Sequence, residues 1–240
     1  MRHKLFLLIR IAFLSLLVPL SKLASTEYRV STAAQIASTM TAAKPGDTLT
    51  MTNGQWMNSA IVFQGKGTAE LPILLRAESY GRVILSGTST LRISGRHLVI
   101  DGLLFKNGYS PSGAVIEFRS GAVESDSCRL TNSAIIDYNP SSSSIDYKWV
   151  SLYGSYNRVD HCYLKGKTHS GATLVVWRLT AKPNYHRIDS NYFAFRPLLF
   201  FNGTTQNGGE TIRIGTSDSS LYDSFTTVEY ELYPKNWTTC

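Results

Sequence analysis

A short phrase of alternating apolar and polar residues recurs along the chain at nearly constant spacing. The polar residue after the first apolar position marks each copy, and these markers are Asp101, Thr131, Asp160, Asp189 and Glu229. The steps between them are 30, 29, 29 and 40 residues. A repeat of this period is typical of a solenoid, in which each coil buries its apolar face against neighbouring coils. We therefore expect the chain to stack coils along one axis.

The alternation within each copy has the period of a β-strand rather than that of a helix. One such strand per turn, at constant spacing, brings like strands side by side in parallel. The repeat thus predicts an all-β fold, a right-handed, single-stranded parallel β-helix over residues 26–240. A β-helix presents a long, shallow face, which suits a polymeric ligand.

The first 25 residues differ in composition from the rest of the chain. A basic start containing Arg2 and Lys4 precedes an apolar run from Ile11 to Leu20, and small residues follow. This order is typical of a secretory signal peptide. The alternative is a membrane anchor, but Arg10 interrupts the roughly 20 apolar residues that a span needs. We expect residues 1–25 to be a signal peptide, no membrane span after its removal, and a secreted or periplasmic protein.

The net charge is small once this segment is set aside. The chain has 24 Lys and Arg against 17 Asp and Glu, and four of the basic residues lie in the first 25 positions. The remaining chain carries +3 rather than +7. A mild positive field is compatible with an acidic polysaccharide as partner, and no nucleic-acid partner is expected.

Two regular elements are predicted before the first marker. Ser31 is a suitable N-cap for a helix over Thr32–Ala43, which would cover the exposed end of the stack. The apolar face of this helix is expected to consist of Ala34, Ile36, Ala37 and Met40. Strands are predicted at Thr48–Met51, Ile73–Arg76, Val83–Leu85, Leu91–Ile93 and Leu98–Phe105.

The three cysteines suggest neither a disulfide framework nor a metal site. Cys128 and Cys162 occupy different places in their repeats, and Cys240 ends the chain. We expect the first two to act as small core residues. His161 lies beside Cys162, but neighbours in a strand point to opposite faces, so a joint catalytic role is not expected.

Two segments are more specific than the repeat: Arg158–Trp177 and the run Asn207-Gly-Gly-Glu-Thr-Ile-Arg-Ile-Gly-Thr-Ser-Asp218. Together with Pro45–Asp47 and His186–Asp189, they resemble polysaccharide lyase family 6, which contains the alginate lyases and the chondroitinase B type enzymes. The resemblance runs from Tyr28 to Tyr233. The Asn-Gly-Gly-Glu run is similar to the alginate lyase branch in particular.

The resemblance implies β-elimination on a uronic acid polymer, assisted by Ca²⁺ against the substrate carboxylate. The resemblance assigns Asn207 as a calcium ligand. The residues alone predict that Asn207 is a turn residue in a Gly-rich loop. The two Glu ligands, the base Lys and the catalytic Arg of the family have no match here. They are expected beyond Cys240, so the chain is expected to be an incomplete β-helix, either a fragment or the product of an altered reading frame.

Three further residues are candidate substrate contacts. His169 would face the groove or be a solvated turn histidine, and Arg196 would bind a substrate carboxylate or lie on the surface. Arg213, between two isoleucines, should point outward from the coil, toward substrate or toward solvent.

Three functions remain open on the sequence alone. The first is a secreted, calcium-dependent alginate lyase, with a chondroitinase B-like lyase as its close alternative. The second is a non-catalytic β-helix that binds carbohydrate. The third is another β-helix enzyme, such as a pectate lyase or a glycoside hydrolase. A glycoside hydrolase needs two neighbouring carboxylates. Asp160 and Asp189 should lie about 4.8 Å apart on consecutive coils, but the repeat gives every pair of equivalent residues that spacing, so it is weak evidence for catalysis.

Overall fold

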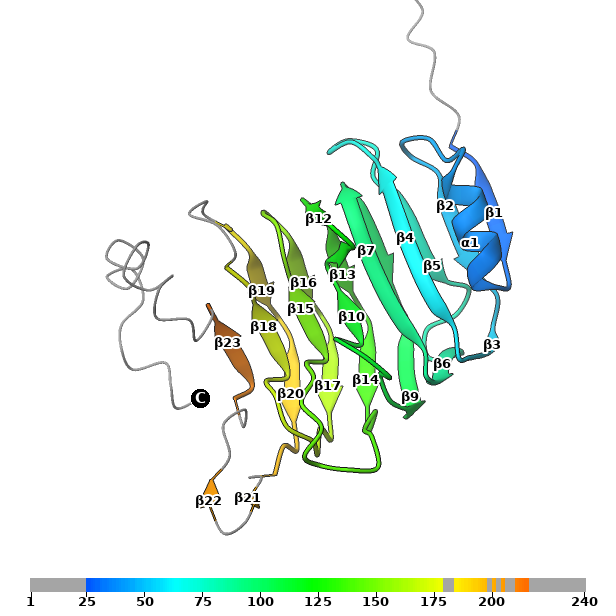
Figure 1. Ribbon diagram of the computed structural model, residues 1–240. Helices are drawn as coiled ribbons and strands as arrows, with labels where there is room; N and C mark the ends of the chain where they lie inside the picture. The colour runs from blue at the N-terminus through cyan, green and yellow to red at the C-terminus, as the bar shows by residue number, and fades with distance from the viewer. Residues whose placement is uncertain (1–24, 179–183, 198–199, 202–203, 206–209, 216–240) are drawn as a thin grey trace, which may run out of the picture.

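The computed structural model describes residues 25–178, 184–197, 200–201, 204–205 and 210–215. It is a parallel β-helix, as the repeat predicts, built from three parallel sheets whose strands follow one another around each coil (Figure 1). The first sheet contains β1 (Glu27–Val30), β2 (Thr48–Met51), β5 (Ile73–Ala77), β8 (Leu98–Asp101), β13 (Arg129–Thr131), β16 (Arg158–Asp160) and β19 (Arg187–Asp189). The second contains β3 (Gly54–Met57), β6 (Val83–Gly87), β9 (Leu104–Gly108), β14 (Ala134–Ile136), β17 (Tyr163–Lys165) and β20 (Tyr192–Ala194).

The third sheet carries the candidate site. Its main strands are β4 (Ala60–Lys66), β7 (Thr90–Arg96), β10 (Ile116–Glu117), β15 (Val150–Leu152), β18 (Leu174–Val176) and β23 (Ile212–Ile214). Two antiparallel hairpins depart from the parallel pattern: β11 (Arg119–Ser120) with β12 (Val123–Asp126), and β21 (Phe200–Phe201) with β22 (Thr204–Thr205). The second hairpin lies in the longer step of the repeat, where the sequence places its extra residues.

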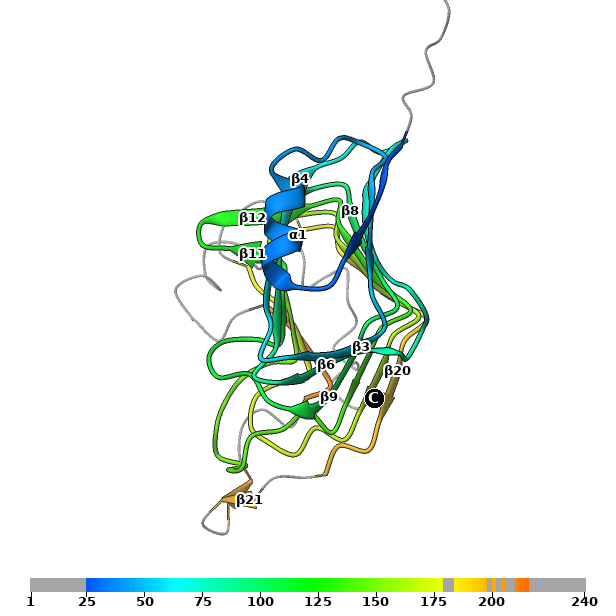
Figure 2. The same cartoon turned by 90° about the vertical axis from the view of Figure 1, so that its right-hand side faces the viewer.

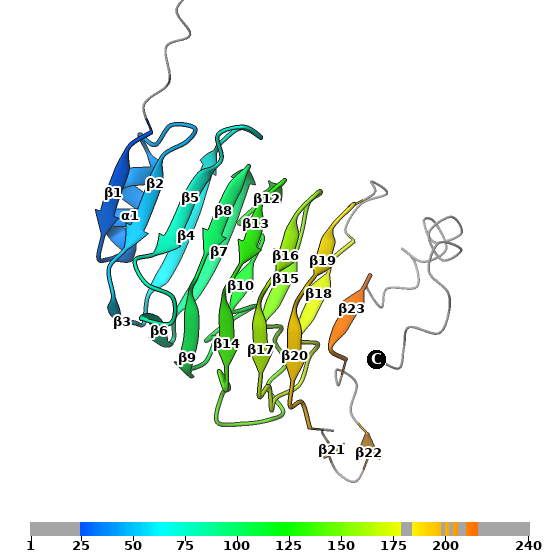
Figure 3. The same ribbon diagram turned by 180° about the vertical axis from the view of Figure 1, so that it is seen from behind.

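The repeat markers lie in register across the first sheet, seen from behind in Figure 3. Thr131 pairs with Asp101 on one side and with Asp160 on the other, and Asp160 pairs with Asp189. The fifth marker, Glu229, lies outside the described residues. The spacing of the phrase in the sequence therefore corresponds to one complete coil.

The phrase itself is not one strand, and the prediction of a single strand over Leu98–Phe105 was wrong. The chain turns a corner inside each copy, so the first half lies in β8 and the second half in β9 of a different sheet. Gly102 sits at this corner with φ +82°, in the left-handed region. Asn132, His161 and Ser190 hold the same place in later coils, with φ of 48°, 51° and 56°. Small polar residues tolerate this conformation better than bulky apolar ones.

The helix α1 (Ala33–Met40) covers the first end of the stack, as Figure 2 shows along the axis. Its N-cap is Thr32 rather than Ser31, because the Thr32 Oγ1 accepts the Gln35 N–H at 3.1 Å. Ala34 and Ala37 are exposed, whereas Ile36 is fully buried and Met40 packs against the core. The predicted cap and apolar face were thus partly wrong. No helix in the described residues is long and apolar enough to cross a membrane.

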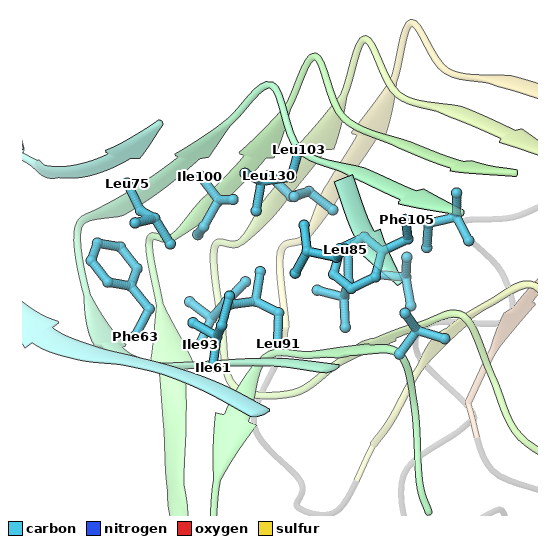
Figure 4. Packing of buried hydrophobic residues seen from close by; sticks show 14 of the residues in the cluster. Ile61, Phe63, Leu75, Leu85, Leu91, Ile93, Ile100, Leu103, Phe105 and Leu130 are labelled. Carbon is cyan, nitrogen blue, oxygen red and sulfur yellow. The ribbon is translucent and has the colours of Figure 1, made fainter. Parts of the chain in front are cut away.

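One continuous core fills the coils, with side chains from all three sheets meeting inside (Figure 4). Leu75, Ile100 and Leu130 stack from consecutive coils of the first sheet, and Ile61 and Leu91 face them from the third. Stacking like residues lets each coil bury the apolar face of the coil before it.

Candidate functional site

The outward face of the third sheet carries a row of aligned side chains, one from each coil. Strand register places them in line, and we call this row the outer ladder: Arg92, Glu117, Ser151, Val175 and Arg213. Their chain neighbours Leu91, Ile116, Val150 and Leu174 are all buried in the core. Because successive side chains in a strand alternate, the ladder points away from the core, although Glu117, Ser151 and Val175 are themselves buried.

Glu117 lies at one end of the ladder between two arginines. Its Oε1 is 2.6 Å from the Arg119 Nε, and its Oε2 is 3.3 Å from the Arg92 Nε. Arg92 also donates to the Ala114 carbonyl at 2.8 Å, and burial lowers the pKa of its guanidinium. Glu124 lies opposite Arg119 in the β11–β12 hairpin, so two carboxylates balance the two cations at this corner.

A second row lies two residues further along the same strands, and we call it the aromatic row: Arg119, Tyr153 and Trp177. The Arg119 guanidinium lies 3.7 Å from the centre of the Tyr153 ring. The Tyr153 and Trp177 rings stack at 5.9 Å with 12° between their planes. No pattern in the sequence singles out these residues, because they come from three coils and meet only when the coils stack.

The turn before β18 is organised around a buried lysine. The Lys167 Nζ donates to the carbonyls of His169, Ser170 and Gly171 at 2.8, 2.7 and 2.7 Å. Burial lowers the pKa of Lys167, whereas three carbonyl acceptors stabilise its charged form, which alone carries three hydrogens. Lys167 therefore serves as an internal clamp for this turn, and sequence reasoning missed it.

His169 is fully buried inside the same turn. Its Nδ1 lies 3.0 Å from the Ser170 carbonyl and 3.2 Å from that of Ile145, and its ring packs on Tyr147 at 3.9 Å. Burial, together with the charge of Lys167, lowers the pKa of His169 to about 3. The ring is neither solvated nor on the outer face. A sugar contact from this position would require the turn to open.

Arg196 is half-buried against the clamp. Its Nη2 donates to the Gly171 carbonyl at 2.7 Å and its Nη1 to the Thr173 Oγ1 at 3.1 Å. Burial lowers the pKa of its guanidinium to about 10. Arg196 also lines a cavity of about 190 Å³ together with Lys167, Thr173 and Trp149. The structure thus places two of the predicted residues, His169 and Arg196, around one turn.

Arg213 lies at the other end of the outer ladder, in register with Val175. It faces outward, as the alternation predicts, and its Nη2 pairs with the Glu210 Oε1 at 2.7 Å. Burial is the largest single influence and raises the pKa of Glu210, but the hydrogen bonds to its carboxylate and the charges of Arg213 and Arg196 together outweigh burial and lower the pKa. Asn207, the predicted calcium ligand, lies outside the described residues.

The described ranges contain no group of three His, Cys, Asp or Glu side chains that could hold a metal ion. Cys128 and Cys162 are buried core residues, and burial raises the pKa of their thiols to about 11 and about 12. His161 is exposed while Cys162 is buried, so they face opposite ways, as the sequence predicts.

Comparisons with known proteins agree with the parallel β-helix fold. The profile of the chondroitinase B family matches residues 30–237. Among solved structures, the alginate lyase AlyGC of polysaccharide lyase family 6 is 40% identical, with a TM-score of 0.75 over 80% of this chain and 26% of its own. A mannuronic acid specific family 6 lyase from human gut microbiota is 32% identical, with a TM-score of 0.71 over 80% of this chain and 44% of its own.

A family 6 polysaccharide lyase from Pseudopedobacter saltans is 34% identical, with a TM-score of 0.68 over 78% of this chain and 41% of its own. This chain therefore spans between about a quarter and a half of these three structures. No curated protein sequence matches it.

Proposed function

Because the chain belongs to polysaccharide lyase family 6, we propose that it acts on alginate, a polymer of mannuronate and guluronate, by β-elimination. The observation that carries the proposal is the 40% identity to the alginate lyase AlyGC over 80% of this chain. The relative described as mannuronic acid specific supports the same class of polymer. The signal-like first 25 residues support a secreted or periplasmic location.

The reaction class sets a clear demand on the site. The hydrogen on C5 of a uronate is weakly acidic, because it lies beside the carboxylate. Its removal adds negative charge to that carboxylate, so positive groups must lie near it in the transition state. Arg92 lies at one end of the outer ladder, with Arg119 of the aromatic row beside it, and Arg213 lies at the other end. In this proposal they bind and orient the polymer, and no described residue is assigned as the base.

The family resemblance also implies Ca²⁺, which would neutralise the substrate carboxylate when bound. Among the residues described, no three His, Cys, Asp or Glu side chains gather to hold such an ion. Asn207, which lies outside the described part of the chain, remains a proposed ligand. No catalytic step is assigned to the ion.

A substrate panel tests this proposal. Purified chain is incubated with polymannuronate, polyguluronate and dermatan sulfate, and the products are analysed by mass spectrometry for unsaturated ends. The proposal expects unsaturated oligosaccharides from one or both alginate polymers. Products from dermatan sulfate alone would favour the chondroitinase B-like alternative. Retention of alginate on the folded protein without any product would favour the non-catalytic binder.

A further inference from the structure

The outer face of the second sheet lies apart from the outer ladder, which belongs to the third sheet. Its strands β9, β14, β17 and β20 lie side by side in Figure 3. Phe105, Ile135 and Leu164 point from these strands into the core, so the residues on either side of each point outward. The outward side chains form two rows that are in register from coil to coil.

One of these rows carries two lysines, and we call it the lysine row: Lys106, Ile136, Lys165 and Ala194. Lys106 and Lys165 are both exposed. Among the described residues, neither ammonium group has an ion-pair or hydrogen-bond partner. Both charges are therefore available to a ligand.

The charge of this face favours an anion. The six strands of the second sheet contain two charged residues, and both are lysines of the lysine row. Asp137, directly after β14, offsets one of these charges, and the exposed Arg82, directly before β6, adds another positive charge. The balance therefore stays positive, which attracts an acidic polymer.

The spacing of the two lysines suits a uronate polymer in particular. Both pair with Ile136, so they lie two coils apart, about 9.6 Å at the usual distance between neighbouring strands. In an extended chain of β-1,4-linked uronates, successive units face opposite ways, and every second carboxylate points to the same side. Two such carboxylates are one disaccharide apart, a length comparable with the separation of the lysines. A chain that runs along the stack of coils can therefore pair with both.

Two tyrosines lie in the row next to the lysines. Tyr163 and Tyr192 pair in register, and their rings are parallel within 2° with centres 5.3 Å apart. Tyr163 precedes Lys165 by two residues, so the two share the outward side of β17. Neither tyrosine hydroxyl has a hydrogen-bond partner among the described residues. A phenol hydroxyl in this place can donate to or accept from a sugar hydroxyl.

We propose that the lysine row, with Tyr163 beside it, is a second binding site for the polysaccharide and takes a stretch of polymannuronate along the axis of the coils. Lys106 and Lys165 bind two carboxylates on the same side of the polymer, and Tyr163 hydrogen-bonds to a sugar hydroxyl. This inference rests on the proposed function for the identity of the polymer. It adds a site that holds the substrate away from the outer ladder and takes no part in bond cleavage.

Protection of individual lysines from acetylation tests the site on the full chain. The protein reacts with an amine-acetylating reagent in the presence of calcium, and mass spectrometry follows each lysine. An oligomannuronate should slow the acetylation of Lys106 and Lys165. It should leave Lys44 and Lys66, two exposed lysines outside the second sheet, at their unprotected rates. The same oligosaccharide with its carboxyl groups reduced should protect none of the four.

Single variants use the remaining lysine as the reporter, once circular dichroism shows that they fold alike. Lys106→Gln should raise the oligomannuronate concentration that half-protects Lys165 about threefold, as expected for the loss of one exposed ion pair. Tyr163→Phe keeps the stacked ring but loses the hydroxyl, and it should raise the same concentration about threefold. Lys66→Gln removes an equal charge elsewhere and is the matched control, which should change nothing.

The outcomes separate the second site from the proposed function. Calorimetric binding of oligomannuronate without protection of Lys106 and Lys165 overturns the second site and leaves the lyase proposal standing. Equal protection by the reduced oligosaccharide also overturns the second site, because the lysines would then not be pairing with carboxylates. No calorimetric binding of oligomannuronate overturns the proposed function, and the second site with it.

Discussion

Arg129 and Asp160, from neighbouring coils, are joined by two hydrogen bonds from a single guanidinium. The Nε lies 2.7 Å from Oδ1 and the Nη2 lies 2.5 Å from Oδ2. The next coil repeats the arrangement, with Arg158 bound to Asp189 at 2.9 and 2.8 Å. The repeat of the sequence thus produces two successive ion pairs that join three consecutive coils, those of β13, β16 and β19.

Asp160→Asn should destabilise the protein, because it leaves Arg129 and Arg158 facing a neutral group in a fully buried position. We expect a loss of about 2 to 4 kcal/mol in the free energy of unfolding, measured in urea. Asp189→Asn is the matched control on a carboxylate that is 26% exposed, and it should cost clearly less because solvent screens the pair. Equal losses would contradict a special role for the buried pair.

His169 should make the protein less stable as the pH falls. Burial lowers its folded pKa to about 3, below the 6.5 of the exposed ring, so the unfolded state takes up a proton first. The stability that the neutral His169 ring contributes is fully present above pH 6.5 and is lost progressively as the pH falls toward 3. His169→Asn should make the melting temperature depend less on pH between pH 6.5 and 4. A residual slope is expected from His186, whose pKa burial lowers to about 4.

Lys167→Met should leave three buried carbonyls without their donor. We expect it to destabilise the chain by about 2 to 3 kcal/mol in urea unfolding. Lys165→Met removes an exposed lysine two residues earlier and serves as control, with a change within about 0.5 kcal/mol. A Lys167 variant as stable as this control would show that the clamp contributes nothing.

Gly95→Ala should be far more harmful than Gly81→Ala, although both glycines have positive φ, +105° and +73°. A Cβ on Gly95 would overlap the Gly65 carbonyl oxygen of the preceding coil, whereas one on Gly81 would meet nothing within 4 Å. We expect losses of about 3 kcal/mol and about 1 kcal/mol. Thermal unfolding of the two variants gives the comparison, and similar melting temperatures would argue against such close stacking.

The sequence was sufficient to predict the coils, because the period of the markers directly reflects one turn. Asp101, Thr131, Asp160 and Asp189 lie in register as their spacing implies. It was not sufficient to predict the corners inside the phrase. The residues at this corner in the described coils are Gly102, Asn132, His161 and Ser190, all at positive φ, and these four types share no pattern that marks a turn.

The site was less predictable than the fold. Arg213 faces outward as alternation requires, but burial of His169 depends on the turn that closes around Lys167. The aromatic row could not be found by spacing, since Arg119 lies 34 residues from Tyr153 and Tyr153 lies 24 from Trp177. The different lengths of these two steps come from loops between coils, which local sequence patterns do not fix.

The most direct test of the lyase proposal is the ultraviolet absorbance of new C4–C5 double bonds when purified chain meets alginate. The measurement is made with calcium and again with a chelator, on protein whose fold is verified by circular dichroism. The proposal predicts a rise with calcium that the chelator abolishes, and such a rise would overturn the expectation that the base Lys and the Glu ligands of the family have no counterpart in this sequence. No rise from folded protein that still binds the polymer would contradict the proposal, and the chain would then be a carbohydrate-binding β-helix without lyase activity.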